Sequence, residues 1–255
     1  MSKIALITGA SSGIGRELSR IHASRGGDLI IVARGDENLN NLKQELQKKY
    51  SCKIYVIVKD LSTPTASQEV YDEVKSQNLD VDYLFNNAGF GGQGYFHERD
   101  WEKDLAMINV NILALTTLTR LFLPGFVKKN SGRILNTSSS AALCPGPLQA
   151  VYYATKAYVT SFSNALAAEL NETNITVSAL MPGATNTKFA MTSGMSKSVL
   201  FKKTSKPYDI ALMGYNGMLE GKLNIFAGIG SPLVNLLKFT PRRTIIKIIK
   251  KRQNV

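Results

Sequence analysis

Apolar residues along the chain occur in two patterns, short continuous runs and longer stretches where they recur every three or four positions. The first pattern is typical of a buried β-strand and the second of an amphipathic helix. The short runs predict strands at Ile4–Thr8, Asp28–Ala33, Lys53–Val58, Tyr83–Asn86, Arg133–Thr137, Thr176–Met181 and Asn224–Ala227. The periodic stretches predict helices at Gly13–Ser24, Asn38–Tyr50, Thr65–Ser76, Asp100–Lys129 with a break near Asn109–Asn111, and Tyr152–Asn171.

Strands that alternate with helices predict β-α-β units and therefore a parallel sheet. We expect an α/β fold, a Rossmann-like doubly wound parallel sheet with right-handed crossovers. The chain has 255 residues, of which 44% are hydrophobic. This composition excludes a disordered protein. Because no Pro/Gly/Ser linker divides the chain, residues 1–255 are interpreted as a single dinucleotide-binding catalytic domain.

Two C-terminal segments depart from the alternating pattern. Residues 186–222 are loosely patterned and contain Gly, Ser, Lys and Met, which predicts a substrate lid. Residues 231–255 form a basic C-terminal tail, predicted as helical over Ser231–Arg252 with an interruption at Pro241.

The net charge of +12 comes almost entirely from the end of the chain. Residues 1–185 carry 18 Lys/Arg and 17 Asp/Glu, whereas residues 186–255 carry 13 and 2. Nucleic-acid binding is not expected, since the basic segment has no recognised motif and no interleaved aromatic residues. We interpret the tail as a helix that packs its isoleucines on the domain; weak contact with an anionic membrane is the alternative.

The remaining compositional features point to a cytoplasmic protein. Cys52 and Cys144 form no ligand-spaced cluster, and neither do His22 and His97, so neither a metal site nor a disulfide framework is expected. We find no apolar run of about 18 residues that predicts a membrane span. The N-terminal residues run directly into the first strand, which does not predict a signal peptide.

A glycine-rich turn connects the first strand to the first helix. Its sequence is Thr8-Gly9-Ala10-Ser11-Ser12-Gly13-Ile14-Gly15. Glycines there allow a diphosphate to approach the backbone and to lie at the helix N-terminus. A second motif, Asn86-Asn87-Ala88-Gly89, ends the fourth strand and supports a nucleotide site over an ordinary turn.

A third motif, Tyr152-Tyr153-Ala154-Thr155-Lys156, carries candidate acid–base chemistry. Residues four apart share a helix face, so Tyr152 and Lys156 can act together. A neighbouring ammonium lowers the pKa of a phenol. Tyr153 is three residues from the same lysine, and this reasoning leaves it as an alternative. Upstream, Thr137-Ser138-Ser139-Ser140 ends the fifth strand, where ligands approach and a serine can hold a carbonyl.

These four elements, in this order, resemble the classical short-chain dehydrogenase/reductase family from Lys3 to about Phe189. The resemblance implies that Tyr152 rather than Tyr153 is the catalytic tyrosine. It also selects Ser139, thirteen residues before that tyrosine, over Ser138 and Ser140. The family's asparagine lies thirteen residues before a helix-terminal proline, here Pro124, which selects Asn111 over Asn109.

The resemblance implies a role for each of these residues. Tyr152 would act as general acid in reduction and as base in oxidation. Lys156 would lower the pKa of Tyr152 and hydrogen-bond the nicotinamide ribose. Ser139 would polarise the carbonyl, and Asn111 would support a water in a proton relay. The implied cofactor-binding residues are Gly9, Ser11, Ser12, Gly13, Ile14, Gly15, Arg34, Asp60, Leu61, Asn87, Ala88, Gly89, Tyr152, Lys156, Pro182, Gly183 and Thr187.

The end of the second strand predicts NADP(H) rather than NAD(H). Ala33 occupies the position where an acidic residue would bind the ribose 2′-hydroxyl of NAD(H). Arg34 follows, and its guanidinium can pair with a 2′-phosphate. Asp36 opposes this prediction if its carboxylate reaches the ribose, whereas Asp28 lies at the far end of the strand.

The expected function is therefore hydride transfer between nicotinamide and a small carbonyl or alcohol substrate. Lys188 and Lys197 near the site leave open a substrate with an acidic group. The other residues expected around the site favour an apolar substrate; they are Phe90, Leu143, Gln149, Phe189 and Met191. The resemblance implies a homodimer or homotetramer formed through residues 111–129 and 152–171. The alternatives are a non-catalytic nucleotide-binding regulator and a surface-binding protein that acts through its basic tail.

Overall fold

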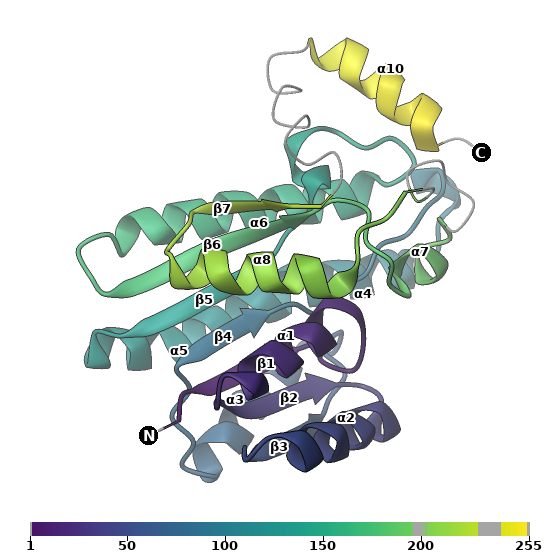
Figure 1. Ribbon diagram of the computed structural model, residues 1–255. Coiled ribbons are helices and arrows are strands. Elements are labelled where there is room, and N and C mark those ends of the chain that lie inside the picture. Colours follow the sequence, from purple (N-terminus) through teal and green to yellow (C-terminus); the bar gives the residue numbers. More distant parts are fainter. Residues whose placement is uncertain (1, 196–200, 202, 229–240, 254–255) are drawn as a thin grey trace.

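The computed structural model describes residues 2–195, 201, 203–228 and 241–253. Its centre is a seven-stranded parallel sheet with the strand order β3-β2-β1-β4-β5-β6-β7 (Figure 1). The strands are β1 (Ile4–Thr8), β2 (Asp28–Ala33), β3 (Ile54–Val58), β4 (Tyr83–Asn86), β5 (Gly132–Thr137), β6 (Ile175–Pro182) and β7 (Asn224–Ala227). Each predicted strand is present, with ends that differ by at most one residue.

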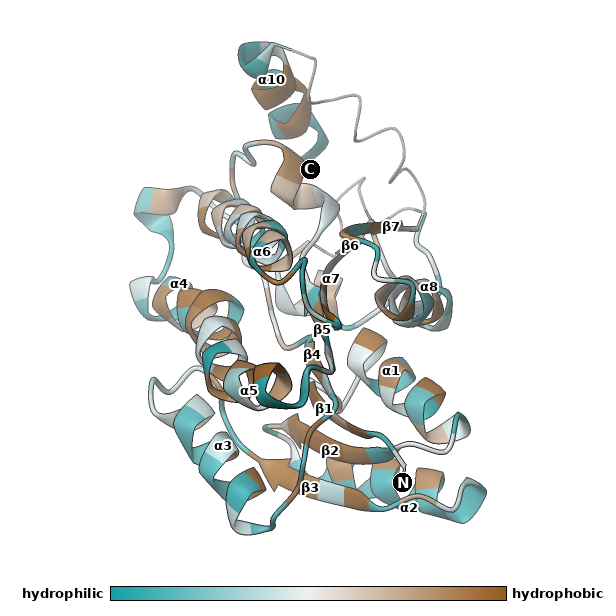
Figure 2. Cartoon of the chain, turned by 90° about the vertical axis from the view of Figure 1, so that its left-hand side faces the viewer, coloured by the Kyte–Doolittle hydropathy of each residue, from teal (hydrophilic) through white to brown (hydrophobic). Residues whose placement is uncertain are grey.

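Helices cover both faces of the sheet (Figure 2). On one side lie α1 (Gly13–Ser24), α2 (Asp36–Lys49) and α8 (Pro207–Leu219). On the other lie α3 (Ala66–Ser76), α4 (Trp101–Ile108), α5 (Leu115–Lys129) and α6 (Ala150–Glu169). The short elements are η1 (Phe96–Glu98), η3 (Ser140–Leu143) and α7 (Phe189–Thr192). The predicted doubly wound fold is confirmed.

The strands are largely hydrophobic, because the central ones are buried on both sides. Side chains alternate along a strand, so neighbouring residues enter different cores. Ile7 and Ile31 pack in the core beneath α1, α2 and α8. Leu6 and Ile30 pack in the core beneath α3, α5 and α6.

The break predicted near Asn109–Asn111 is wrong, because the chain stays helical there. A π-helical stretch, η2 (Asn109–Ala114), joins α4 directly to α5. Such stretches accommodate an extra residue and are frequent at functional sites. Pro124 also does not end its helix, since α5 continues to Lys129 and is capped by Asn130 in the left-handed conformation, with φ of 45°.

The expectation that no segment is apolar enough to span a bilayer also needs correction. By length and composition alone, Trp101–Lys129 is sufficiently long and apolar. The segment alternates polar and apolar residues, so it contains no continuous apolar run. In the fold it carries buried core residues, among them Met107, Leu118 and Phe126.

Part of the predicted lid belongs to the core. Within residues 186–222, α8 packs against α1, β5, β6 and β7. Ile210, Ala211 and Tyr215 of this helix are buried in the main hydrophobic core. Their apolar periodicity is masked by Gly214 and Gly217, which allow α8 to lie close to Leu180 and Ile225. Residues 196–200 and 202 of the predicted lid lie outside the described residues.

The tail prediction is confirmed for its last part. Helix α10 (Arg242–Gln253) begins directly after Pro241. Ile245 and Ile249 are buried, as expected for a helix that packs its isoleucines on the domain. The first part of the predicted tail helix, residues 231–240, lies outside the described residues.

Candidate active site

The glycine-rich turn lies at the carboxyl end of β1, where the strand order reverses between β1 and β4. Ligands of open α/β sheets bind at such a switch point. Gly9 and Gly13 have φ values of 66° and 55°, which side chains disfavour. A Cβ atom on Gly15 would lie 2.4 Å from the Gly9 carbonyl oxygen. The turn is therefore a tight cradle, and Ser12 caps α1 without using its side chain.

The Asn86–Gly89 motif fixes this turn to the neighbouring strands. The Thr8 hydroxyl oxygen accepts hydrogen bonds from the backbone N–H groups of Asn87 and Ala88, both at 3.0 Å. The Asn87 side-chain amide donates to the Thr8 carbonyl oxygen at 3.0 Å. The Thr137 hydroxyl, at the end of β5, donates to the Asn87 side-chain oxygen at 3.4 Å. One asparagine thus ties together the ends of β1, β4 and β5.

The remaining predicted cofactor residues extend from this cradle. The methyl carbon of Thr187 would lie 3.0 Å from a Cβ atom on Gly13, so the segment after β6 meets the glycine turn. Arg34 follows β2, with its side chain 74% exposed and 3.8 Å from Asp60. These residues fit an elongated dinucleotide, because the cradle has backbone N–H groups for a diphosphate and a cation at its far end.

The candidate catalytic residues converge beside this cradle. Tyr152 and Lys156 lie on one face of α6, and both are buried. The Lys156 ammonium lies 5.9 Å from the centre of the Tyr152 ring and donates to the Thr137 carbonyl oxygen at 2.8 Å. Ser139 hydrogen-bonds Tyr152, and its hydroxyl oxygen accepts from the Ala141 backbone N–H at 3.1 Å.

The structure also distinguishes the serines and tyrosines that the sequence left open. The Ser138 hydroxyl donates to the Lys156 carbonyl oxygen at 2.9 Å and is 2.7 Å from the Thr160 hydroxyl, so it joins β5 to α6. The Tyr153 hydroxyl accepts a hydrogen bond from the Gln253 side chain at 2.9 Å. Tyr153 therefore holds α10, and Tyr152 is the tyrosine beside Ser139.

Asn111 lies in the π-helical stretch and is buried. Its amide donates to the Phe90 carbonyl oxygen and to the Thr155 hydroxyl, both at 3.0 Å, and its oxygen accepts from the Phe90 backbone N–H at 3.1 Å. Gly89 lies between Asn111 and Lys156, since a Cβ atom there would be 2.9 Å from the Asn111 oxygen. Asn111 thus joins the loop after β4 to α6.

Burial dominates the electrostatics of the pair. It raises the pKa of Tyr152 to about 12, and the hydrogen bond with Ser139 opposes this only in part. Burial also lowers the pKa of Lys156 to about 8. The sequence reasoning considered only the lowering effect of Lys156, whereas burial brings the pKa of Tyr152 above its usual value in this structure. A protonated Tyr152 is suited to donate a proton to a carbonyl oxygen held by Ser139.

Among the residues expected to favour an apolar substrate, Phe90 and Phe189 pack on the cluster that contains Tyr152. The Tyr152 and Phe189 ring centres are 5.3 Å apart. Gln149 is buried, whereas Met191 is 67% exposed and contributes little to the site. Lys197 lies outside the described residues.

Three contributors to the site were not singled out from the sequence. Thr8 has a visible signal, since its hydroxyl lies at a strand end beside the glycines. Thr155 shares a helix turn with Tyr152 and bonds Asn111. Gln253 has no local signal, because its contact with Tyr153 joins residues that are 100 positions apart.

We predict that Thr8→Val destabilises the fold by about 2 kcal/mol, because two backbone N–H groups lose their acceptor. Urea unfolding followed by circular dichroism measures this change. Thr65→Val is the matched control, since its hydroxyl makes an exposed bond to Glu69; we expect a loss below about 0.5 kcal/mol. Equal losses in the two variants would contradict the role assigned to Thr8.

Comparison with known proteins identifies the family of the chain. The short chain dehydrogenase family matches residues 3–197. The very-long-chain 3-oxoacyl-CoA reductase of Anas platyrhynchos is 32% identical over 97% of this chain and 83% of its own length. The Mus musculus protein of the same name is 34% identical over 73% of this chain, and that match spans 60% of its length.

Solved structures share the fold over most of the chain. A short-chain dehydrogenase from Sphingobium yanoikuyae in complex with NADPH has a TM-score of 0.85 and 28% identity, and the match covers 99% of this chain and 98% of that one. A 3-ketoacyl-(acyl-carrier-protein) reductase from Brucella melitensis complexed with NADH has a TM-score of 0.76 and 28% identity, over 88% and 96% of the two chains. This protein belongs to the short-chain dehydrogenase family and is an oxidoreductase that uses a nicotinamide cofactor.

Proposed function

We propose that this protein is an NADPH-dependent reductase of a carbonyl group on a largely apolar substrate. The observation that carries the proposal is the convergence of Tyr152, Ser139 and Lys156 at the carboxyl end of β5, beside the glycine-rich cradle. When bound, the nicotinamide supplies the hydride, and Tyr152 supplies the proton. Ser139, bonded to Tyr152, orients the substrate oxygen, and Asn111 and Lys156 position the loop and strand around it.

The apolar cluster around Tyr152 supports the choice of substrate class. Met107, Ala141, Ile245 and Ile249 are buried in that cluster, and hydrophobic walls bind hydrocarbon. Because relatives at about one-third identity are named 3-oxoacyl-CoA reductases, long-chain 3-oxoacyl thioesters are the first substrates to test. NADPH oxidation with thioesters of increasing acyl length, against a panel of neutral ketones, measures this preference.

Tyr152→Phe should lower kcat by at least about a hundredfold, because the variant has no proton to transfer. Tyr153→Phe should lower it by less than about tenfold, since the Tyr153 hydroxyl bonds α10 instead of the reacting atoms. Initial rates of NADPH oxidation measure both, and NADPH binding by fluorescence should be nearly unchanged in each. Loss of turnover in Tyr153→Phe with retention in Tyr152→Phe would falsify the assignment of the acid.

We infer a preference for NADP(H) over NAD(H) from the residues around Arg34. Ala33 ends β2, so no carboxylate occupies that strand end. Asp36, the residue that argued against the preference, lies in the first turn of α2 and accepts a hydrogen bond from Asn40 at 2.6 Å. Arg34 is exposed and only loosely paired with Asp60, which leaves its guanidinium able to meet a 2′-phosphate.

Arg34→Ala should lower kcat/KM for NADPH by about tenfold or more and leave the value for NADH nearly unchanged, because only NADPH carries the phosphate. Steady-state kinetics with both cofactors on wild type and variant measure the effect. Asp60→Asn is the control, since it releases Arg34 without removing the cation. A wild type that prefers NADH would contradict the assignment.

We propose that the protein assembles as a homodimer or homotetramer through α5 and α6. The outer face of these helices and of the adjoining η2 carries exposed apolar side chains, among them Leu113, Val127 and Tyr158. Light scattering measures the mass of the assembly.

The proposed location is the cytoplasm. The free cysteines Cys52 and Cys144 are suited to a reducing compartment, and cell fractionation tests this location.

The outer face of α10 supports weak, peripheral contact with anionic membranes. Lys247, Lys250 and Lys251 are exposed, while Ile245 and Ile249 are buried against the domain. Binding to vesicles that contain phosphatidylserine should therefore occur at low salt and fall steeply as salt rises.

Co-sedimentation of the protein with such vesicles measures this binding, and neutral phosphatidylcholine vesicles are the control. Substitution of the three lysines by glutamine should abolish binding, because each contributes about 1 kcal/mol near the surface. Binding that does not respond to salt, or that survives in the triple variant, would leave α10 with its packing role alone.

A further inference from the structure

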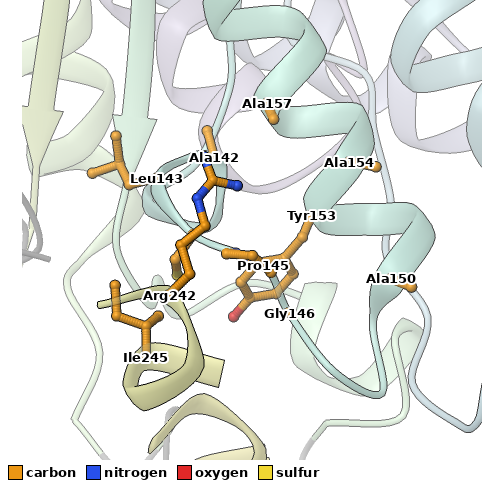
Figure 3. Close-up of a pocket in the computed structure, with 11 residues that line it drawn as sticks. Ala142, Leu143, Pro145, Gly146, Ala150, Tyr153, Ala154, Ala157, Arg242 and Ile245 are labelled. Atoms are coloured by element: carbon orange, nitrogen blue, oxygen red, sulfur yellow. The ribbon is translucent and has the colours of Figure 1, made fainter. Parts of the chain in front are cut away.

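A cavity of about 600 Å³ lies between η3, the first half of α6 and α10 (Figure 3). Its walls are largely apolar and include Leu143, Pro145, Ala154 and Ile245. This volume is within the range of small-molecule sites in proteins. None of the residues that carry the proposed proton transfer lines it.

The cavity adjoins the reacting groups on two sides. The segment that forms its floor, Ala142–Gly146, follows Ser139 by three residues. Tyr153, which lines the cavity, has its ring centre 6.1 Å from that of Tyr152 in an edge-to-face arrangement. A substrate whose carbonyl lies at Tyr152 can therefore place a remote part here.

Helix α10 is a fixed wall of this cavity. The Gln253 side chain donates to the Tyr153 hydroxyl at 2.9 Å, and the Gln93 side chain donates to the Gln253 carbonyl oxygen at 2.7 Å. Ile245 and Ile249 are buried against the domain. Contacts at both ends of α10 thus determine which of its side chains face the cavity.

One of those side chains is Arg242, the first residue of α10. Its side chain extends across the cavity toward Ala142 and Leu143 (Figure 3). Arg243, the next residue, does not line the cavity. Both arginines are exposed, but only Arg242 lies over the cavity.

The described lining of the cavity has no charge that neutralises Arg242. It contains no carboxylate. Burial raises the pKa of the Cys144 thiol and of the Tyr153 phenol, so both stay neutral. A guanidinium that faces apolar walls is suited to pair with an anion through two parallel hydrogen bonds.

We propose that this cavity binds an anionic group of the substrate through Arg242, so that the substrate is an amphipathic carbonyl compound. The inference rests on the proposed reductase function and narrows its substrate class. The apolar walls contact the hydrocarbon part, and Arg242 holds a carboxylate or phosphate. Arg242 is accordingly a specificity-determining residue that does not take part in proton transfer.

The test compares substrates that differ only in charge. Saturated oxo fatty acids, with the ketone moved along the chain, are each compared with their own methyl ester in NADPH oxidation. For at least one ketone position, wild type should prefer the acid by about tenfold in kcat/KM, as expected for a hydrogen-bonded charge pair. A parallel arm with 3-oxoacyl-CoA thioesters distinguishes phosphates from a carboxylate as the bound anion.

Arg242→Gln should remove the preference by raising KM for the anionic substrate about tenfold, with kcat and the methyl-ester rates unchanged. Arg243→Gln is the matched control and should retain the preference. The inference is overturned if the two variants behave alike, or if acids and esters react equally in wild type. Turnover of none of these ketones by wild type would instead contradict the proposed function.

A binding measurement separates the site from catalysis. Parinaric acid, a fluorescent fatty acid, should bind wild type and Arg243→Gln more tightly than Arg242→Gln by about tenfold, whereas its methyl ester should not distinguish them. The competing role for Arg242 is pairing with a second copy of the chain. If Arg242→Gln lowers the mass in light scattering and slows acids and esters alike, Arg242 is an interface residue and the proposal fails.

Discussion

The hydrogen bonds between Thr8 and Asn87 hold the site together, because they join the two strands between which the winding direction of the sheet reverses. The chain leads from β1 to β2 on one side of the sheet and from β4 to β5 on the other. The covalent connections therefore do not hold the ends of β1 and β4 together. Thr8 accepts from two backbone N–H groups, and Asn87 returns a bond to β1 and receives one from β5. Glycine is required at position 9, because a side chain would collide with Ala88.

Burial gives Tyr152 and Lys156 their chemical character. Both side chains lie in a mostly apolar surrounding, where the charged form of each is disfavoured. The phenol therefore keeps its proton, while the ammonium loses its own more readily than in water. Tyr152 therefore holds a proton that it can transfer to a carbonyl oxygen. Spacing along a helix is insufficient to assign a pKa, since burial of the phenol opposes the lowering effect of a neighbouring ammonium.

The sequence was sufficient for the strands, and for the residues that meet at their ends. Strands such as Ile4–Thr8 are buried on both faces, so their hydrophobic runs are unambiguous. The glycine turn, Asn87, Ser139 and the Tyr152–Lys156 pair all follow strands or begin a helix, and the structure brings them together.

Predictions failed where residues that usually end a helix lie in segments that tertiary contacts keep helical. Asparagines at 109 and 111 indicated a break, yet their amides bond Ser62, Phe90 and Thr155, and the helix continues through a π-helical stretch. The glycines of α8 led to the prediction of a lid, but in the structure they let this helix lie close to the sheet. In each case a contact distant in sequence outweighed the local preference.

Helix α10 shows how one segment can combine packing with two kinds of electrostatic contact. Its buried residues Ile245, Ile249 and Gln253 are four positions apart, so they form a single face that contacts the domain. The lysines project from the opposite face toward solvent. Arg242 is three positions before Ile245 and lies on the same side of the helix, where its side chain extends over the cavity. The basic character of the tail therefore has separate physical consequences at its two surfaces, and net charge alone does not distinguish them.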